Sequence, residues 1–447
     1  MQISCFKAYD VRGRMPDELN EEVARRIGRA YAEFIKPEKV VVGHDMRLSS
    51  RSLTDALIKG LVAGGVNVYD IGLCGTEEVY FATFFKEMDG GIMVTASHNP
   101  ADYNGMKFVR EKSIPISADT GLEEIRSLAE KNEIDDAAKP GEVKTLDVKA
   151  EYIRHLLGYV SATALKPLKV VVNAGNGCAG PIIDLLEPHL PFEFVRQFHE
   201  PDGTFPNGIP NPLLEENRQA TAEAVLGEKA DVGIAWDGDF DRCFFFDEKA
   251  RFIEGYYVVG MLAEVLLKKN PGGKIVHDPR LTWNTIDIVK AAGGVAVQCK
   301  SGHAFIKEMM RREDAVYGGE MSAHHYFREF SYCDSGMIPW LLVLQLMSET
   351  GKTLSELVDE CIEKYPASGE INRKLSDADQ AMDLIYNQYA GSALHVDTTD
   401  GYSFEYPEWR FNLRKSNTEP LVRLNVESRG DIELMKAKTG EILSLLQ

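Results

Sequence analysis

The stretch V-V-V-G-H-D-M-R-L-S, residues 40–49, has the pattern of a buried strand that runs into a polar turn. A similar stretch, I-V-H-D-P-R-L-T, occupies residues 275–282, and both contain H-D-x-R-L-(S/T) after the apolar run. In both places a helical pattern and a second apolar run follow, at residues 66–68 and 295–297. A match in register at this many positions favours duplication over chance. Together with the third strand described next, this repeat leads us to expect three related α/β domains.

A third β-branched run, residues 169–172, lies between these two and opens into a glycine-rich turn. Strands that alternate with helices predict mostly parallel sheets. The tail differs, because residues 409–414 and 422–426 alternate between apolar and polar, and a helix is expected from about residue 432. The expected fold is three similar mixed-sheet α/β domains and a smaller C-terminal α+β domain, with limits at 1–147, 148–251, 252–367 and 368–447.

The composition restricts the partners of the protein. The 447 residues carry a net charge of −19, which argues against nucleic acid and against an anionic membrane surface. A small anionic substrate is still compatible, because distant charges are screened beyond about 8 Å. The seven cysteines form no C-x-x-C pair, there is no apolar leader, and the most apolar run, residues 337–347, is too short to span a bilayer. We expect a reduced, cytoplasmic protein.

The sequence D-G-D-F-D-R, residues 237–242, follows the apolar run 232–236. On a loop that leaves a strand, its three carboxylates can converge and repel one another, so a hard divalent cation is a natural partner. An EF-hand is disfavoured because Arg242 stands where glycine is required, although Glu248 falls at the twelfth position. A solvated acidic turn is the remaining alternative.

The stretch G-N-G-C-A-G, residues 175–180, matches a dinucleotide-binding signature. About 20 residues further on there is no clean acid at a strand end, so close packing is the favoured explanation. A nicotinamide-dependent dehydrogenase stays open as an alternative.

Two later stretches carry polar groups suited to a sugar phosphate. Residues 318–325, G-G-E-M-S-A-H-H, offer hydrogen-bonding groups for hydroxyls, and adjacent histidines on an extended segment point opposite ways, which disfavours a metal site. The segment 414–420 and Arg423 offer guanidinium forks, hydroxyls and an amide, which suit a phosphate dianion. A structural loop and ordinary surface charge are the respective alternatives.

Ser97 lies in T-A-S-H-N-P, residues 95–100. The G-x-S-x-G elbow of α/β-hydrolases is absent there, and His98 is too close in the chain to be a good base for this serine. A serine hydrolase is therefore disfavoured. A serine that carries a phosphoryl group facing a divalent metal would link this loop to the three aspartates.

The motifs T-A-S-H-N-P, D-G-D-F-D-R, G-E-M-S-A-H and R-x-S-N-T-E-P, in this order, resemble the α-D-phosphohexomutase family, and especially its bacterial phosphomannomutases. The resemblance covers the whole chain, including F-K-A-Y-D-V-R-G at residues 6–13. It implies four domains around one central cleft. It also implies interconversion of mannose 6-phosphate and mannose 1-phosphate for GDP-mannose synthesis, through a phosphoserine and a hexose 1,6-bisphosphate intermediate that is also an activator. Phosphoglucomutase or phosphoglucosamine mutase activity with the same mechanism, and a non-catalytic sugar-phosphate binder, are the alternatives.

The resemblance assigns roles to particular residues. Ser97 would be the phosphoserine, and one Mg²⁺ per chain would be held by Ser97, Asp237, Asp239 and Asp241. The other expected catalytic residues are His98, Lys107, Arg242 and His303. The expected substrate-binding residues are Tyr9, Arg12, Arg280, Gly302, Glu320, Ser322, His324, Arg414, Ser416, Asn417, Thr418 and Arg423. The candidates for proton transfer are Lys107, His303 and His324. The expected partner is a small hexose phosphate, and a monomer and a homodimer are both compatible with the sequence.

Overall fold

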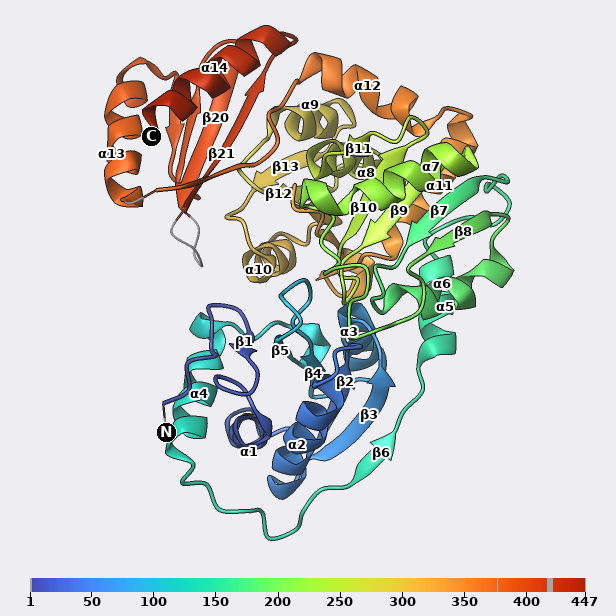
Figure 1. Cartoon of the computed structure of the whole chain (residues 1–447), viewed down its shortest axis with the longest axis vertical. Helices are drawn as coiled ribbons and strands as arrows, with labels where there is room; N and C mark the ends of the chain where they lie inside the picture. Colours follow the sequence, from blue (N-terminus) through green and yellow to red (C-terminus); the bar gives the residue numbers. More distant parts are fainter. Residues whose placement is uncertain (1, 376, 416–420, 447) are drawn as a thin grey trace. The chain divides into compact units, whose positions relative to one another are not determined.

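The computed structural model describes residues 2–375, 377–415 and 421–446 (Figure 1). The chain forms two compact units. Unit 1 comprises Met1–Phe252 and Glu329–Thr350, and unit 2 comprises Ile253–Arg328 and Gly351–Gln447. Within the described ranges, no helix has both the length and the apolar character needed to cross a membrane.

The first sheet of unit 1 is mixed. Its strand order is β1-β5-β4-β2-β3-β6, and β2 pairs in parallel with β3 and β4, whereas β5 is antiparallel to β4 and β1. The strands are β1 (Val11–Arg14), β2 (Lys39–His44), β3 (Asn67–Leu73), β4 (Gly90–Val94), β5 (Tyr103–Arg110) and β6 (Val143–Thr145). The helices are α1 (Glu21–Ile35), α2 (Ser50–Ala63), α3 (Thr76–Phe85) and α4 (Leu122–Lys131). Helix α1 packs so closely on α2 that a Cβ at Gly60 would lie 2.0 Å from the Arg25 carbonyl oxygen.

The second sheet of unit 1 has the order β11-β10-β9-β7-β8, in which β10 is antiparallel to β9, and β7 is parallel to β8 and β9. Its strands are β7 (Lys169–Asn173), β8 (Glu193–Gln197), β9 (Val232–Trp236), β10 (Cys243–Asp247) and β11 (Phe252–Ile253). The helices are α5 (Lys149–Leu157), α6 (Ala179–Leu186) and α7 (Gln219–Glu228), and β16 (Cys333–Asp334) and α11 (Ile338–Thr350) return to this unit. The predicted apolar run is thus the buried helix α11, and Trp236 Nε1 donates to the Gly336 carbonyl oxygen at 2.9 Å just before it.

Unit 2 contains an α/β part and an antiparallel part. The first has strands in the order β13-β12-β14-β15, namely β12 (Lys274–His277), β13 (Val295–Gln298), β14 (Tyr317–Gly319) and β15 (His325–Phe327). Its helices are α8 (Gly255–Lys269), α9 (Trp283–Ala291), α10 (His303–Glu313) and α12 (Leu354–Lys364). The second has the order β17-β21-β20-β19-β18.

In the antiparallel part the strands are β17 (Ile371–Lys374), β18 (His395–Asp397), β19 (Tyr402–Glu405), β20 (Trp409–Lys415) and β21 (Leu421–Ser428). Helices α13 (Ala378–Tyr389) and α14 (Ile432–Leu445) pack on this sheet (Figure 1). The fold class expected from the sequence, three similar mixed-sheet α/β domains and a smaller C-terminal domain, is confirmed. The four domain limits stay predictions.

The repeated motif adopts the same local structure in both copies. His44 Nδ1 lies 2.8 Å from the Asp45 carbonyl oxygen, and His277 Nδ1 lies 2.9 Å from that of Asp278. The main-chain N–H of Arg47 donates to Asp45 Oδ1 at 3.0 Å, and the main-chain N–H of Arg280 donates to Asp278 Oδ1 at 2.9 Å. The turn after β2 and the turn after β12 are therefore equivalent.

Candidate active site

Ser97 lies in the turn between β4 and β5 in a left-handed conformation, with φ of 47°. Such a backbone costs of order 1–3 kcal/mol for a residue other than glycine, so the surroundings must hold it in place. Its N–H donates to Thr95 Oγ1 at 2.8 Å. Its Oγ donates to Asp237 Oδ2 at 2.9 Å and lies 3.1 Å from His98 Nδ1. The serine predicted to carry a phosphoryl group thus touches the predicted metal loop.

The acidic loop follows β9 and is buried. Asp237 and Asp239 are fully buried, Asp241 is 2% exposed, and ligand oxygens of the three lie within 4.8 Å of one another. Lys107 on β5 donates to Asp239 Oδ2 at 2.7 Å and to Asp241 Oδ2 at 2.5 Å. Arg242 donates to Asp237 Oδ2 through Nε at 2.8 Å and Nη2 at 2.7 Å. A lysine of β5 and an arginine of the acidic loop itself therefore pair with the three carboxylates.

The electrostatics of this cluster fix several protonation states. Burial alone would disfavour the charge on Asp239, but Lys107 and the hydrogen bond from Thr76 hold the pKa of Asp239 below its ordinary value. Burial also opposes the charge on Lys107, and the carboxylates of Asp239 and Asp241 nevertheless raise the pKa of Lys107. Desolvation of the ring beside Arg242, together with the charge of that arginine, lowers the pKa of His98 well below its ordinary value, although the residue as a whole is exposed. The lysine is therefore charged and the histidine neutral at physiological pH.

The cluster fits a divalent cation. Its three carboxylates are the hard oxygen ligands that such ions prefer, and they sit close enough to share one ion. Asp239 Oδ1 is buried and accepts no hydrogen bond from any residue that the structure describes. A buried carboxylate oxygen without a donor is costly unless a cation binds it. The acidic cluster could therefore hold a metal ion.

Two further predicted residues of unit 1 lie in or beside β1. Arg12 donates through Nη1 to the Thr95 carbonyl oxygen at 3.1 Å and through Nε to Asp10 Oδ2 at 2.8 Å, so it reaches the Ser97 turn. Tyr9 is half-buried in the segment that precedes β1. The structure thus brings Arg12 to the site, together with Ser97 and the acidic loop.

In unit 2, three loops bring the predicted sugar-binding residues together. Arg280, after β12, donates to Ser322 Oγ at 3.3 Å and lies 3.6 Å from Glu320 Oε1. Gly302, before α10, donates to the same Glu320 oxygen at 2.8 Å. The rings of His303 and His324 have centroids 6.4 Å apart. All six predicted residues of this part of the chain therefore form one polar cluster.

Three arginines of unit 2 converge on Glu370, a residue that no sequence motif marks. Arg414 and Arg423 are paired across β20 and β21. They donate to Glu370 at 3.2 and 3.1 Å, and Arg280 donates to it at 3.2 Å. The other three predicted phosphate ligands, Ser416, Asn417 and Thr418, lie outside the described residues.

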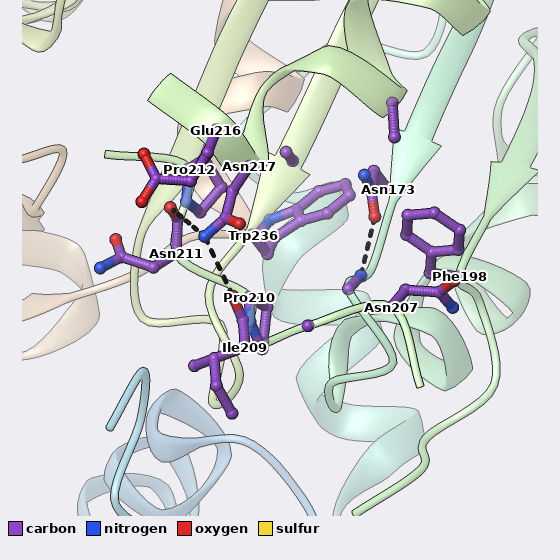
Figure 2. Close-up of a pocket in the computed structure, with 14 residues that line it drawn as sticks. Asn173, Phe198, Asn207, Ile209, Pro210, Asn211, Pro212, Glu216, Asn217 and Trp236 are labelled. Carbon is purple, nitrogen blue, oxygen red and sulfur yellow. Dashed lines mark hydrogen bonds between the residues drawn. The ribbon is translucent and has the colours of Figure 1, made fainter. Parts of the chain in front are cut away.

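The glycine-rich loop after β7 packs against protein. Gly175 N–H donates to Asn173 Oδ1 at 2.9 Å, and a Cβ at Gly177 would lie 2.7 Å from the Gly238 carbonyl oxygen. A pocket of about 150 Å³ lies beside this loop. Asn173, Asn217 and Trp236 line it (Figure 2). Asn217 Nδ2 donates to the carbonyl oxygens of residues 209 and 211, both at 3.1 Å. The glycines thus serve close packing against the acidic loop, as the sequence favoured, which speaks against a dinucleotide site.

The comparisons with known proteins agree with this geometry. Models of the phosphoglucomutase/phosphomannomutase family match domain I at residues 4–135, domain II at 150–251, domain III at 254–365 and the C-terminal domain at 370–442. Three related α/β sheets with one different C-terminal sheet, and a serine against an acidic loop, define a class of four-domain proteins. The chain belongs to the phosphoglucomutase/phosphomannomutase family.

Individual relatives match over the full chain. The chain is 62% identical to a protein named phosphomannomutase from Escherichia coli, over 454 residues that cover 100% of both. It is 62% identical to proteins named phosphohexose mutases from Xanthomonas campestris pv. campestris (strain B100), again covering 100% of both. A solved phosphoglucomutase/phosphomannomutase family protein from Burkholderia thailandensis is 32% identical, with a TM-score of 0.89, and the match covers 99% of this chain and 97% of that one.

Proposed function

We propose that the protein interconverts mannose 6-phosphate and mannose 1-phosphate for GDP-mannose synthesis, with Ser97 as the phosphoryl carrier. The observation that carries the proposal is the contact of Ser97 Oγ with Asp237, inside a buried cluster of three carboxylates. Full-length similarity to proteins named phosphomannomutase supports the choice of sugar.

The reaction consists of two phosphoryl transfers at Ser97. In the first, the O6 hydroxyl of mannose 1-phosphate attacks the phosphorus of phosphoserine. The new P–O bond forms as the bond to Ser97 Oγ breaks, the hydroxyl proton is lost, and Oγ is protonated. The resulting 1,6-bisphosphate turns around, and its 1-phosphoryl group passes to Ser97 Oγ, which releases mannose 6-phosphate. Such transfers depend on in-line positioning and charge neutralisation.

The residues of unit 1 would supply that neutralisation. Mg²⁺, one ion per chain, would be held by Asp237, Asp239, Asp241 and the oxygen of Ser97, and would offset charge on the phosphoryl oxygens. Lys107 and Arg242 are suited to the same task, because both are buried cations beside these carboxylates. Lys107 keeps its proton because its pKa is raised, so it suits the role of a fixed cation better than that of an acid or a base.

The residues of unit 2 would bind the rest of the substrate. Arg280, Gly302, Glu320, Ser322 and His324 offer hydrogen bonds to the sugar hydroxyls, and His303 beside them is a candidate for proton transfer. Arg414 and Arg423 suit the phosphate that does not react, because guanidinium forks bind phosphate in a bidentate manner. Ser416, Asn417 and Thr418 are proposed for the same phosphate, and Tyr9 and Arg12 for substrate at the Ser97 side.

A second candidate keeps the mechanism and changes the sugar to glucose or glucosamine. It is favoured by the family itself, whose models name both phosphoglucomutase and phosphomannomutase. The kcat/KM values for mannose 1-phosphate, glucose 1-phosphate and glucosamine 1-phosphate decide between these sugars. We further propose a cytoplasmic location and activation by hexose 1,6-bisphosphate. Light scattering will distinguish a monomer from a homodimer.

The carrier role is tested with Ser97→Ala. The variant should lose mutase turnover by at least a thousandfold, because no other hydroxyl takes the phosphoryl group, and mass spectrometry of the parent protein should find phosphate on Ser97. Ser113→Ala is the matched control. Ser113 is a buried, left-handed serine with φ of 56° that donates to the Tyr80 carbonyl oxygen. Unchanged turnover in Ser97→Ala would refute the proposal.

A further inference from the structure

The two copies of the repeated motif direct their arginines to different targets. In the second copy, the guanidinium of Arg280 donates to the carboxylates of Asp278 and Glu370. In the first copy, the guanidinium of Arg47 donates to four main-chain carbonyl oxygens in and beside the Ser97 turn. These are the oxygens of Ser97 at 2.9 Å, Asn99 at 2.6 Å, Pro100 at 2.7 Å and Tyr103 at 2.9 Å. Arg47 therefore binds the turn that carries the proposed phosphoserine.

The main-chain N–H of Ser97 is connected, through Thr95, to Asp45 beside Arg47. Thr95 Oγ1 accepts from Ser97 N–H at 2.8 Å and donates to Asp45 Oδ2 at 2.7 Å. Asp45 Oδ2 lies 3.5 Å from Arg47 Nε, and Asp45 Oδ1 accepts from the Arg47 main-chain N–H at 3.0 Å. The main-chain donor and acceptor of Ser97 are thus both tied, directly or through Thr95, to the Asp45–Arg47 pair.

The pair is itself fixed in the interior of unit 1. Asp45 is 1% exposed and Arg47 is 3% exposed. The Arg47 guanidinium carbon lies 5.0 Å from the centre of the Phe205 ring, and the Arg47 main chain forms a bridge with Gly203. Phe205 and Gly203 come from the same part of the chain as the acidic loop. Arg47 therefore connects the serine turn to the sheet from which Asp237 projects.

The energies show why such a connection is needed. A left-handed serine costs of order 1–3 kcal/mol, and each buried carbonyl without a donor costs about 1–3 kcal/mol. A turn that lost the guanidinium fork would relax toward other conformations, and Ser97 Oγ would leave Asp237. Misplacement of a reacting atom by about 1 Å can cost on the order of 100-fold in rate.

We infer that Arg47 is a positioning residue for phosphoryl transfer at Ser97: it holds the serine turn in the conformation that points Oγ at Asp237. The inference rests on the proposed function. In that reaction Oγ gives up and takes back a phosphoryl group in each turnover, so it must occupy the same position both times. Arg47 acts through the main-chain carbonyl oxygens of that turn.

The test compares Arg47→Lys with wild type. A lysine keeps the charge but has no planar fork, so it cannot serve four carbonyl oxygens at once. We expect kcat to fall at least 30-fold, KM to change less than threefold, and hydrogen exchange of the amides in residues 95–103 to accelerate at least tenfold in the unphosphorylated protein. In Arg47→Ala, added guanidinium should restore part of kcat, whereas ammonium at equal concentration should not.

Arg29→Lys is the matched control. Arg29 is a buried arginine of α1, 6% exposed, that donates to the Asp135 carbonyl oxygen away from the Ser97 turn. It should lower thermal stability without changing kcat or exchange in residues 95–103. If hydrogen exchange in residues 95–103 of Arg47→Lys equals that of wild type, the inference is overturned, whatever the activity. It is also overturned if kcat falls no further in Arg47→Lys than in Arg29→Lys. Accelerated exchange combined with a wild-type protein that has no mutase turnover would instead refute the proposed function and leave the structural role of Arg47 standing.

Discussion

Replacement of Lys107 by methionine should make the protein less stable without metal and improve its binding of Mg²⁺. The Lys107 ammonium lies 2.7 Å from Asp239 Oδ2 and 2.5 Å from Asp241 Oδ2, and Lys107 is 9% exposed. Removal of one partner from a buried ion pair leaves an uncompensated charge and costs about 3–5 kcal/mol. Thr76 still donates to Asp239, so we expect the lower end, about 3 kcal/mol.

The same change should favour the cation. A unit positive charge and a divalent ion that contact the same oxygens repel each other by on the order of 2 kcal/mol even at the dielectric constant of water. Since about 1.4 kcal/mol is a factor of ten in Kd, Lys107→Met should bind Mg²⁺ at least tenfold more tightly than wild type. Added Mg²⁺ should therefore restore most of the lost stability in the variant.

The assay is calorimetric titration of Mg²⁺ into unphosphorylated protein, with thermal unfolding at several Mg²⁺ concentrations. Lys86→Met is the control, because Lys86 pairs with Glu151 at 3.0 Å in a position where both side chains are 30% exposed. An exposed pair of this kind contributes about 1 kcal/mol or less, and its loss should leave the Kd for Mg²⁺ unchanged. Equal or weaker Mg²⁺ binding by Lys107→Met would show that the lysine and the cation do not share these carboxylates.

Two further predictions concern stability. Glu77→Gln should lower the free energy of unfolding of unit 1 by about 2–3 kcal/mol. One carboxylate oxygen of Glu77 accepts from Ser335 Oγ and Tyr152, the other accepts from the Gly336 and Met337 N–H groups, and a carboxamide has only one accepting oxygen. Urea unfolding measures the change, and a loss below about 0.5 kcal/mol would contradict the prediction. Desolvation and Arg242 lower the pKa of His98 in the folded protein, so the unfolded chain binds the proton first as the pH falls. Wild type should therefore lose stability between pH 7.5 and 5.0. The stabilisation from a neutral His98 is fully present above the ordinary pKa of histidine. In His98→Gln this loss should be smaller than in wild type, and an identical pH slope in both proteins would be evidence against a neutral His98.

The sequence was most informative for the short motifs that contain the reactive side chains and for the repeated turn. Ser97 and the three aspartates were paired from motifs alone, and in the structure the turn after β4 and the loop after β9 meet within unit 1 through the Ser97–Asp237 hydrogen bond. The repeat predicted equivalent turns after β2 and β12, since the shared His, Asp and Arg make the same local hydrogen bonds in both. Local chemistry and strand periodicity were sufficient for these features.

Long-range contacts of single residues could not be predicted in this way. Glu370 follows a linker and has no motif, and its role as acceptor for Arg280, Arg414 and Arg423 depends on strand pairing in the C-terminal sheet. The targets of Arg47 are fixed by the path of the serine turn, about 50 residues further along the chain. The buried helix α11 joins unit 1 through partners such as Trp236, about 100 residues earlier, and apolar content alone does not indicate which core a helix enters.

The most direct test of the account follows a labelled phosphoryl group through Ser97. Unphosphorylated protein with Mg²⁺ is incubated with hexose 1,6-bisphosphate carrying ³²P, and the labelled peptide is identified before and after a chase with unlabelled mannose 1-phosphate. The account predicts one label per chain on Ser97, removed by the chase at a rate no slower than kcat and recovered in sugar phosphate. A label on any other residue, or a Ser97 label that survives the chase while turnover continues, would contradict it.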